Sequence, residues 1–129
     1  MNRHLVRLKF GAAVWNHWRS ENPDVTVVLD GEQLDGMILT GIDFSRVSLR
    51  GASLHATNLM NADLRHADLS GANLTEADLI NANLEGATLT GCMLREADLL
   101  GAKLTSAQFD PEDLVGALHL PENLKSEII

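Results

Sequence analysis

The sequence predicts an all-β solenoid: a right-handed quadrilateral parallel β-helix of about four coils, with an N-terminal α-helical cap and a short C-terminal helix. Residues 27–111 divide into 17 consecutive five-residue units without an insertion, and the central residue of every unit is Leu or Phe. On an α-helix, leucines five residues apart would be roughly 140° apart, and in a straight strand they would alternate between faces. If the chain instead bends by about 90° once per unit, every central side chain points to one axis and four units close a coil.

The first predicted element is an N-terminal helical cap over residues 1–26, with a helical pattern from residue 3 to residue 20. One apolar stripe contains Leu5, Leu8, Ala12 and Trp15, with Phe10, Val14 and Trp18 beside it. Asn22 and Pro23 end the helix. We expect this helix to cover the open edge of the first coil, where Glu32, Met37 and Ile42 replace the usual small first residue. Contact with a membrane or a partner is the alternative.

The repeat region, residues 27–111, has a distinct residue preference at each position of the unit. The first residue is Ala, Val, Thr or Cys in 14 units, the second is Asp or Asn in eight, and the fifth is Gly in eight. We expect the first and central residues to point inward and the second and fourth outward, because side chains alternate along extended backbone. The fifth position requires a turn conformation that Gly, Asn and Ser tolerate. The Asp and Asn side chains are expected to bind nearby backbone in the turn.

The third predicted element, residues 112–129, is a short C-terminal helical cap with a tail. Asp110 is suited to cap a helix that has Pro111 at its first position and two acidic residues in its first turn. The tail is apolar at Leu118, Leu120, Leu124, Ile128 and Ile129. It either covers the top edge of the solenoid or joins two molecules, so we expect a monomer or a weak dimer through an end cap.

The repeats, above all the run ADLRHADLSGANLTEADLINANLEG, closely resemble the pentapeptide-repeat family over about two thirds of the chain. The upstream segment VWNHWRSENPDV is similar to the lead-in of many cyanobacterial members. The resemblance implies the square right-handed β-helix already inferred from the period. It also implies one possible activity, because some members of the family mimic duplex DNA and inhibit or protect DNA gyrase.

Composition argues against several classes of function. With 18 acidic and 10 basic side chains, the net charge of −8 opposes binding to nucleic acid or to anionic lipid. Cys92 lies at an inward position and is expected to fill the core, and the histidines are expected to be solvated surface residues: His4, His17, His55, His66 and His119. We therefore expect no catalytic, cofactor or metal site and no enzyme activity. No secretory or membrane-spanning segment is evident, so we expect a cytoplasmic protein.

The distribution of charge gives the one candidate binding surface. If residues 20 apart stack, the side through Leu34, Leu54, Leu74 and Leu94, continued into Leu114 with Glu112 and Asp113, has a net charge of −5. Its candidate docking residues for a basic partner are Glu32, Asp35, Glu76 and Glu96. Solubility is the other explanation for this charge. The sequence therefore predicts a non-enzymatic interaction or scaffold module whose partner is another protein; the alternatives are a DNA-mimicking modulator of gyrase and a structural spacer.

Overall fold

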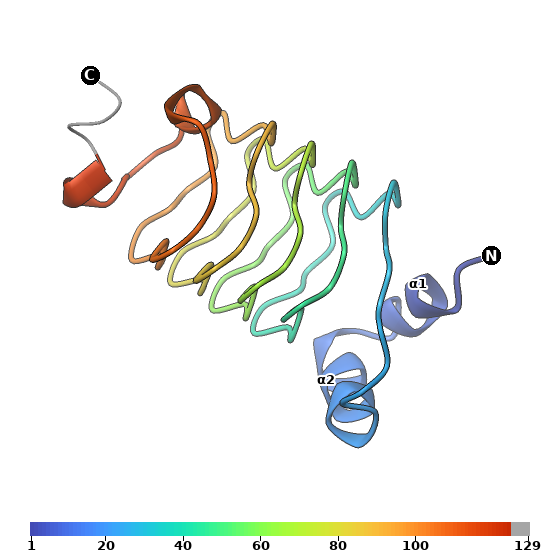
Figure 1. The fold of residues 1–129 in the computed structure, drawn as a ribbon. Coiled ribbons are helices and arrows are strands. Elements are labelled where there is room, and N and C mark those ends of the chain that lie inside the picture. The colour runs from blue at the N-terminus through green and yellow to red at the C-terminus, as the bar shows by residue number, and fades with distance from the viewer. Residues whose placement is uncertain (125–129) are drawn as a thin grey trace.

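The structure is a computed structural model that describes residues 1–124. In it, the repeat region forms a coil with a period of 20 residues. Parallel bridges join residues 20 apart, from Val28 with Ser48 at one end to Asp98 with Leu118 at the other. The coils stack in one direction, with the N-terminal helices at one end of the stack and the C-terminal segment at the other (Figure 1). Each coil therefore contains four five-residue units, as the sequence predicts.

The four sides of the coil are defined by their central residues. Side 1 contains Leu29, Leu49, Leu69 and Leu89, side 2 contains Leu34, Leu54, Leu74, Leu94 and Leu114, side 3 contains Leu39, Leu59, Leu79 and Leu99, and side 4 contains Phe44, Leu64, Leu84 and Leu104. These residues are buried, with at most 9% of their surface exposed. The first residues of most units, such as Ala72 and Ala82, are also buried. The inward positions are therefore those expected from the sequence.

A turn with the same geometry separates each unit from the next. The amide of each first residue donates to the carbonyl of the preceding central residue, as from Glu32 to Leu29 at 3.2 Å. Every fifth residue from Gly31 to Ser106 has a left-handed φ, between 56° and 75°. A positive φ at the third residue of such a turn is the pattern of a type II turn. Half of these corners are not glycine, so they hold an L-residue in a conformation that costs free energy.

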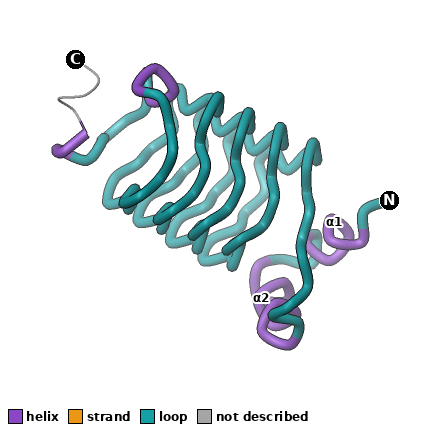
Figure 2. The backbone as a smooth tube through the Cα atoms, viewed as in Figure 1, coloured by secondary structure: helices purple, strands orange, loops and turns teal. Residues whose placement is uncertain are grey.

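The bridges are isolated, and this differs from the continuous rungs that a β-helix suggests. Within residues 1–124, no strand extends beyond a single bridged residue, and Figure 2 accordingly shows the coils as loop. The turns explain this, because a turn every five residues leaves only one residue per unit with extended backbone that can bridge to the neighbouring coils. The coil is held together by backbone hydrogen bonds that repeat from unit to unit, such as Leu74 N–H to Met93 O at 2.8 Å.

The N-terminal segment forms two helices, α1 (Arg3–Leu8) and α2 (Ala12–Glu21), where the sequence predicts one. Gly11 separates them with a φ of 98°, which no α-helix accommodates. The stripe with Leu8 and Trp15 faces the core, but Phe10 and Val14 are 72% and 49% exposed. Phe10 and Val14, which the sequence places beside this stripe, therefore lie outside the core. Among residues 1–124, no helix has the length and apolar character needed to span a membrane.

Helix α2 covers the edge of the first coil on side 4. Trp15 lies edge-on to Phe44, with ring centroids 5.5 Å apart. Asn16 donates to the Gly41 carbonyl at 3.0 Å and accepts from the Asp43 amide at 2.7 Å. Arg19, which is 6% exposed, donates to the Ser45 carbonyl at 2.7 Å. These contacts make the N-terminal segment a lid on the first coil.

At the other end, the short helix expected after Asp110 is present as a 3-10 helix, η1 (Pro111–Leu114). The Asp110 amide donates to the Asp113 carboxylate at 2.9 Å. The coil resumes beyond η1, because Leu118 still bridges Asp98, and a helical turn begins at residue 122. Ile128 and Ile129, the last residues of the predicted apolar tail, lie outside the described residues.

Candidate partner-docking surfaces

The predicted acidic docking residues lie on side 2. Asp35, Glu76 and Glu96 are exposed, whereas Glu32, at an inward first position, is half-buried. Glu76 and Glu96 occupy the same corner in consecutive coils and share a φ of 61°. The rung spacing of a parallel ladder is about 4.8 Å, so the two backbones are close and their carboxylates project from one edge.

Two of these four acids already have partners within the coil. The Asp35 carboxylate accepts from the hydroxyl of Ser53 and, at 3.1 Å, from the amide of His55. The ring of His55 contacts the Glu76 carboxylate, with 2.8 Å between Nε2 and Oε2. Asp35 and Glu76 are therefore linked through one histidine across three coils. Within the described chain the carboxylate of Glu96 has neither an ion-pair nor a hydrogen-bond partner, so among the three exposed acids of this set it is the one free to meet an external cation.

Cys92 lies behind this surface and is 4% exposed. Burial, with a smaller contribution from the nearby Asp113 carboxylate, raises the pKa of its thiol to about 12. The thiol therefore stays protonated at neutral pH and is a poor nucleophile. A hollow of about 280 Å³ lies beside it, between Met93, Arg95 and Glu112.

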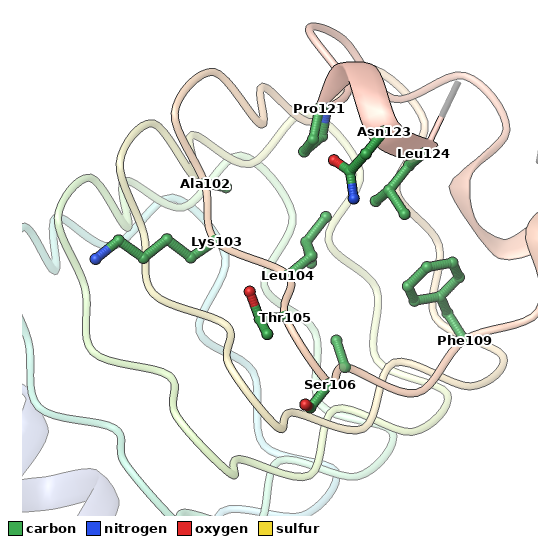
Figure 3. Close-up of a pocket in the computed structure, with 10 residues that line it drawn as sticks. Ala102, Lys103, Leu104, Thr105, Ser106, Phe109, Pro121, Asn123 and Leu124 are labelled. Carbon is green, nitrogen blue, oxygen red and sulfur yellow. The ribbon is translucent and has the colours of Figure 1, made fainter. Parts of the chain in front are cut away.

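A hollow of about 630 Å³ lies at the C-terminal end of the coil (Figure 3). The apolar side chains of Leu104, Phe109 and Leu124 lie along it, and Lys103 points away from it. Among residues 1–124, its lining contains no acid, histidine or cysteine, and its charged residue is Lys103.

The histidines are distributed over separate parts of the surface. His55 and His119 contact acids of the coil, the latter with Nδ1 at 2.9 Å from Asp98, and His17 pairs with Glu21 within α2. His4 lies beside Arg7, and partial burial together with that guanidinium lowers its pKa. In residues 1–124, no three His, Cys, Asp or Glu side chains converge in a way that could hold a metal ion.

Side 3 carries a row of outward apolar side chains, which its charges do not reveal. Between residues 27 and 106, the outward fourth position of a unit is apolar only at Met60, Ile80 and Leu100. These three residues are 20 apart, so they stack in consecutive coils. Every other fourth position holds a polar or charged residue. The signal was available in the sequence, and reading each column of stacked residues for hydropathy as well as charge would have found it.

Comparison with known proteins gives a consistent result for the repeat region. A family model described as pentapeptide repeats matches residues 33–65, 57–94 and 82–110, with eight copies. Together these matches span residues 33–110, more than half of the chain. No curated protein matches the sequence.

Several crystal structures are similar to this chain. Alr5209, a pentapeptide repeat protein from Nostoc PCC 7120, is 30% identical with a TM-score of 0.58, and the match covers 78% of this chain and 76% of Alr5209. HetL, a pentapeptide repeat protein involved in heterocyst differentiation regulation in Nostoc sp. strain PCC 7120, is 41% identical with a TM-score of 0.36, over 67% of this chain and 43% of HetL. A pentapeptide repeat protein from the thylakoid lumen of Arabidopsis thaliana is 27% identical with a TM-score of 0.40, over 80% of this chain and 74% of that protein.

Proposed function

Because this chain belongs to the pentapeptide-repeat family, we propose that it is a non-enzymatic protein-interaction or scaffold module whose partner is another protein. We also infer that its four-sided coil has the right-handed sense typical of the family. A cytoplasmic location forms part of the proposal, and the single cysteine, buried as a free thiol, fits a reducing compartment.

The observation that carries this proposal is the acidic surface of side 2. Glu76 and Glu96 project from one corner in consecutive coils, and Asp35 and Glu32 belong to the same side. The backbone below them is fixed by hydrogen bonds to the neighbouring coils, such as Glu76 N–H to Arg95 O at 2.9 Å. A partner with a basic surface therefore meets carboxylates on a rigid support. Such complementarity increases the association rate and excludes acidic competitors.

Modulation of DNA gyrase by DNA mimicry is the second candidate, supported by the net charge of −8. The length of the coil argues against it. Seventeen units of five residues make 85/20, or about 4.25 coils, which at about 4.8 Å per rung gives about 20 Å, or about six base pairs. Side 4 is also neutral, since Arg46, Arg65 and Lys103 balance three acids. Inhibition of gyrase supercoiling at low micromolar protein, lost when Glu76 and Glu96 are neutralised, would favour this candidate over the scaffold.

Affinity capture from a lysate of the native host tests the main proposal. The bait is the full chain, compared with Glu76→Gln/Glu96→Gln on the acidic surface and with Glu85→Gln/Asp24→Asn as a control of equal charge change elsewhere. We expect one or more proteins to be enriched by the parent and by the control, and to be depleted at least tenfold from the acidic-surface variant. Equal recovery by all three baits, or no protein enriched by the parent, would contradict the proposal.

A further inference from the structure

Side 3 contains a column of outward apolar side chains that the fold does not use. The parallel bridges of Asn58 with Asp78 and of Asp78 with Asp98 fix the register of three consecutive coils. Met60, Ile80 and Leu100 each follow one of these bridged residues by two positions, so they form a stack with a spacing of about 4.8 Å. We call these three residues the apolar column.

The apolar column is separate from the core. The central residues of the same units, Leu59, Leu79 and Leu99, fill the interior and are at most 1% exposed. Leu100 is 51% exposed, and Met60 and Ile80 are partly exposed. Exposed apolar side chains also lie at the two ends of the adjacent column of bridged residues, where Ile38 is 75% and Leu118 44% exposed. An extended apolar patch on one side of an otherwise polar surface is typical of a binding site.

Acidic side chains flank two of the three residues of the apolar column, and Asn58 takes the equivalent place beside Met60. Asp78 and Asp98 lie two residues before Ile80 and Leu100, about 6.6 Å away along extended backbone. Each accepts from the amide of its apolar neighbour with Oδ1, at 3.1 and 3.0 Å. Asp98 also contacts His119, but Oδ2 of Asp78 has no partner among residues 1–124. The units of side 3 contain no Lys or Arg, so the charge that complements this side is positive.

The spacing of the column discriminates between the shapes a binding segment could have. An α-helix along the solenoid axis presents an apolar side chain about every 5.4 Å, so over two rungs it drifts by only about 1.2 Å from the column. An extended strand along the same axis presents one about every 6.6 Å, and its drift over two rungs is about 3.6 Å. The column therefore matches a helix with one apolar contact per coil.

From this geometry we propose that side 3 binds an amphipathic α-helix of a partner protein, with its apolar stripe on Met60, Ile80 and Leu100 and a lysine or arginine against Asp78. The helix lies along the solenoid axis and spans at least three turns. This inference rests on the proposed role as an interaction module, but it uses a different side from the acidic surface, so the two can fail independently.

A designed peptide tests the proposal with the full-length protein. The probe is a fluorescein-labelled 15-residue peptide of Leu and Lys with its leucines on one helical stripe, and binding is followed by fluorescence anisotropy. We expect Ile80→Asp to weaken binding at least tenfold, whereas Thr90→Asp, which also introduces an acid at a fourth position but on side 1, leaves it within twofold. A scrambled peptide of the same composition and a Leu/Glu peptide with the same leucine spacing should each bind at least tenfold more weakly. Thermal unfolding of both variants checks that they fold, and Leu100→Ser provides a second variant without an added charge.

Several results would overturn the inference. Equal losses of peptide affinity for Ile80→Asp and Thr90→Asp, or unchanged peptide binding by Leu100→Ser, would show that the apolar column is not the binding site. If Glu76→Gln/Glu96→Gln alone abolishes binding, the peptide uses the acidic surface; side 3 then fails while the proposed function stands. Two further measurements test whether side 3 binds something other than a partner helix. A dimer of the parent that Ile80→Asp converts to a monomer would make side 3 a contact between copies, and Ile80-dependent binding to phosphatidylcholine vesicles would make it a lipid contact.

Discussion

The indole Nε1–H of Trp15 donates to the backbone carbonyl of Asp43 at 2.8 Å. One coil further along, the equivalent carbonyl, that of Asp63, accepts from the backbone amide of Phe44, also at 2.8 Å. The Trp15 side chain therefore replaces the hydrogen bond that a coil below would have supplied. Asn16 does the same for the Asp43 amide, so the lid satisfies polar backbone groups that an open solenoid end would expose.

Substitution of Trp15 tests this role of the lid. Trp15 is fully buried, so we expect Trp15→Ala to lower the free energy of unfolding by about 3–5 kcal/mol. Trp15→Phe keeps most of the ring packing but leaves the Asp43 carbonyl without its donor, and should cost about 1 kcal/mol. Val14→Ala, at an exposed position of the same helix, is the control and should change stability by less than about 0.5 kcal/mol. Urea unfolding measures all three, and a Trp15→Ala protein as stable as Val14→Ala would contradict the account.

The interior of the middle coil gives the second prediction. Leu74 and Ala72 are fully buried on side 2. Leu74→Asp buries an unpaired charge and should unfold the protein, as measured by far-ultraviolet circular dichroism. Leu74→Met conserves volume and should cost less than about 1.5 kcal/mol. Ala72→Phe should destabilise the protein strongly, because the interior beside Leu74 has no room for the ring. A Tm within about 2 °C of the parent would show that Ala72 does not face the core.

A feature of this molecule could be predicted from the sequence where it follows from the five-residue period. The period of five forces a bend in every unit, so the inward position of Leu74 and the stacking of Glu76 on Glu96 could be derived from it. The break at Gly11 could not, because the helical spacing of Leu8, Ala12 and Trp15 continues across it. The contact of His55 with Glu76 joins residues 21 apart through their side-chain rotamers, which a periodic pattern does not specify.

The corner conformation gives the third prediction through a matched pair of substitutions. Ala56 and Gly51 are the fifth residues of adjacent units, with φ of 56° and 65°. Ala56→Gly should stabilise the protein by about 0.5–1 kcal/mol, because glycine adopts left-handed backbone without steric cost. Gly51→Ala should destabilise it by about 1 kcal/mol through backbone strain. Strain is the only cost, because an added Cβ would meet no atom within 4 Å and so would not clash. Chemical unfolding of both variants is the measurement, and effects of the same sign would contradict the turn assignment.

The fourth prediction concerns acid stability on side 4. The hydrogen bonds from Arg65 hold the pKa of the Asp63 carboxyl below its usual range, with Nε at 2.9 Å from Oδ1 and Nη2 at 2.7 Å from Oδ2. A carboxyl with a depressed pKa contributes stability above its unfolded pKa of about 3.9, and that stability is lost as the pH falls through the folded pKa. Arg65→Met should therefore raise the pKa of Asp63 and reduce stability near neutral pH, with the difference from the parent shrinking toward pH 2.

Carboxyl resonances followed by NMR between about pH 2 and pH 7 measure this shift directly, because the range brackets the ordinary Asp pKa. Arg46→Met serves as the control, since Arg46 is exposed and makes no ion pair or side-chain hydrogen bond within residues 1–124. An Asp63 pKa that moves equally in both variants would show that general charge, rather than the Arg65 hydrogen bonds, sets it.

Carboxyl footprinting of the protein bound to its captured partner tests the central claim, that one acidic side of a rigid solenoid binds another protein. The free protein and the complex are labelled with a carbodiimide and an amine, and the modification of each Asp and Glu is compared by mass spectrometry. We predict at least threefold protection of Glu76 and Glu96, with the labelling of Asp30 and Glu85 on sides 1 and 4 unchanged. Equal labelling of Glu76 and Glu96 in the two states, or protection spread evenly over all four sides, would contradict the account.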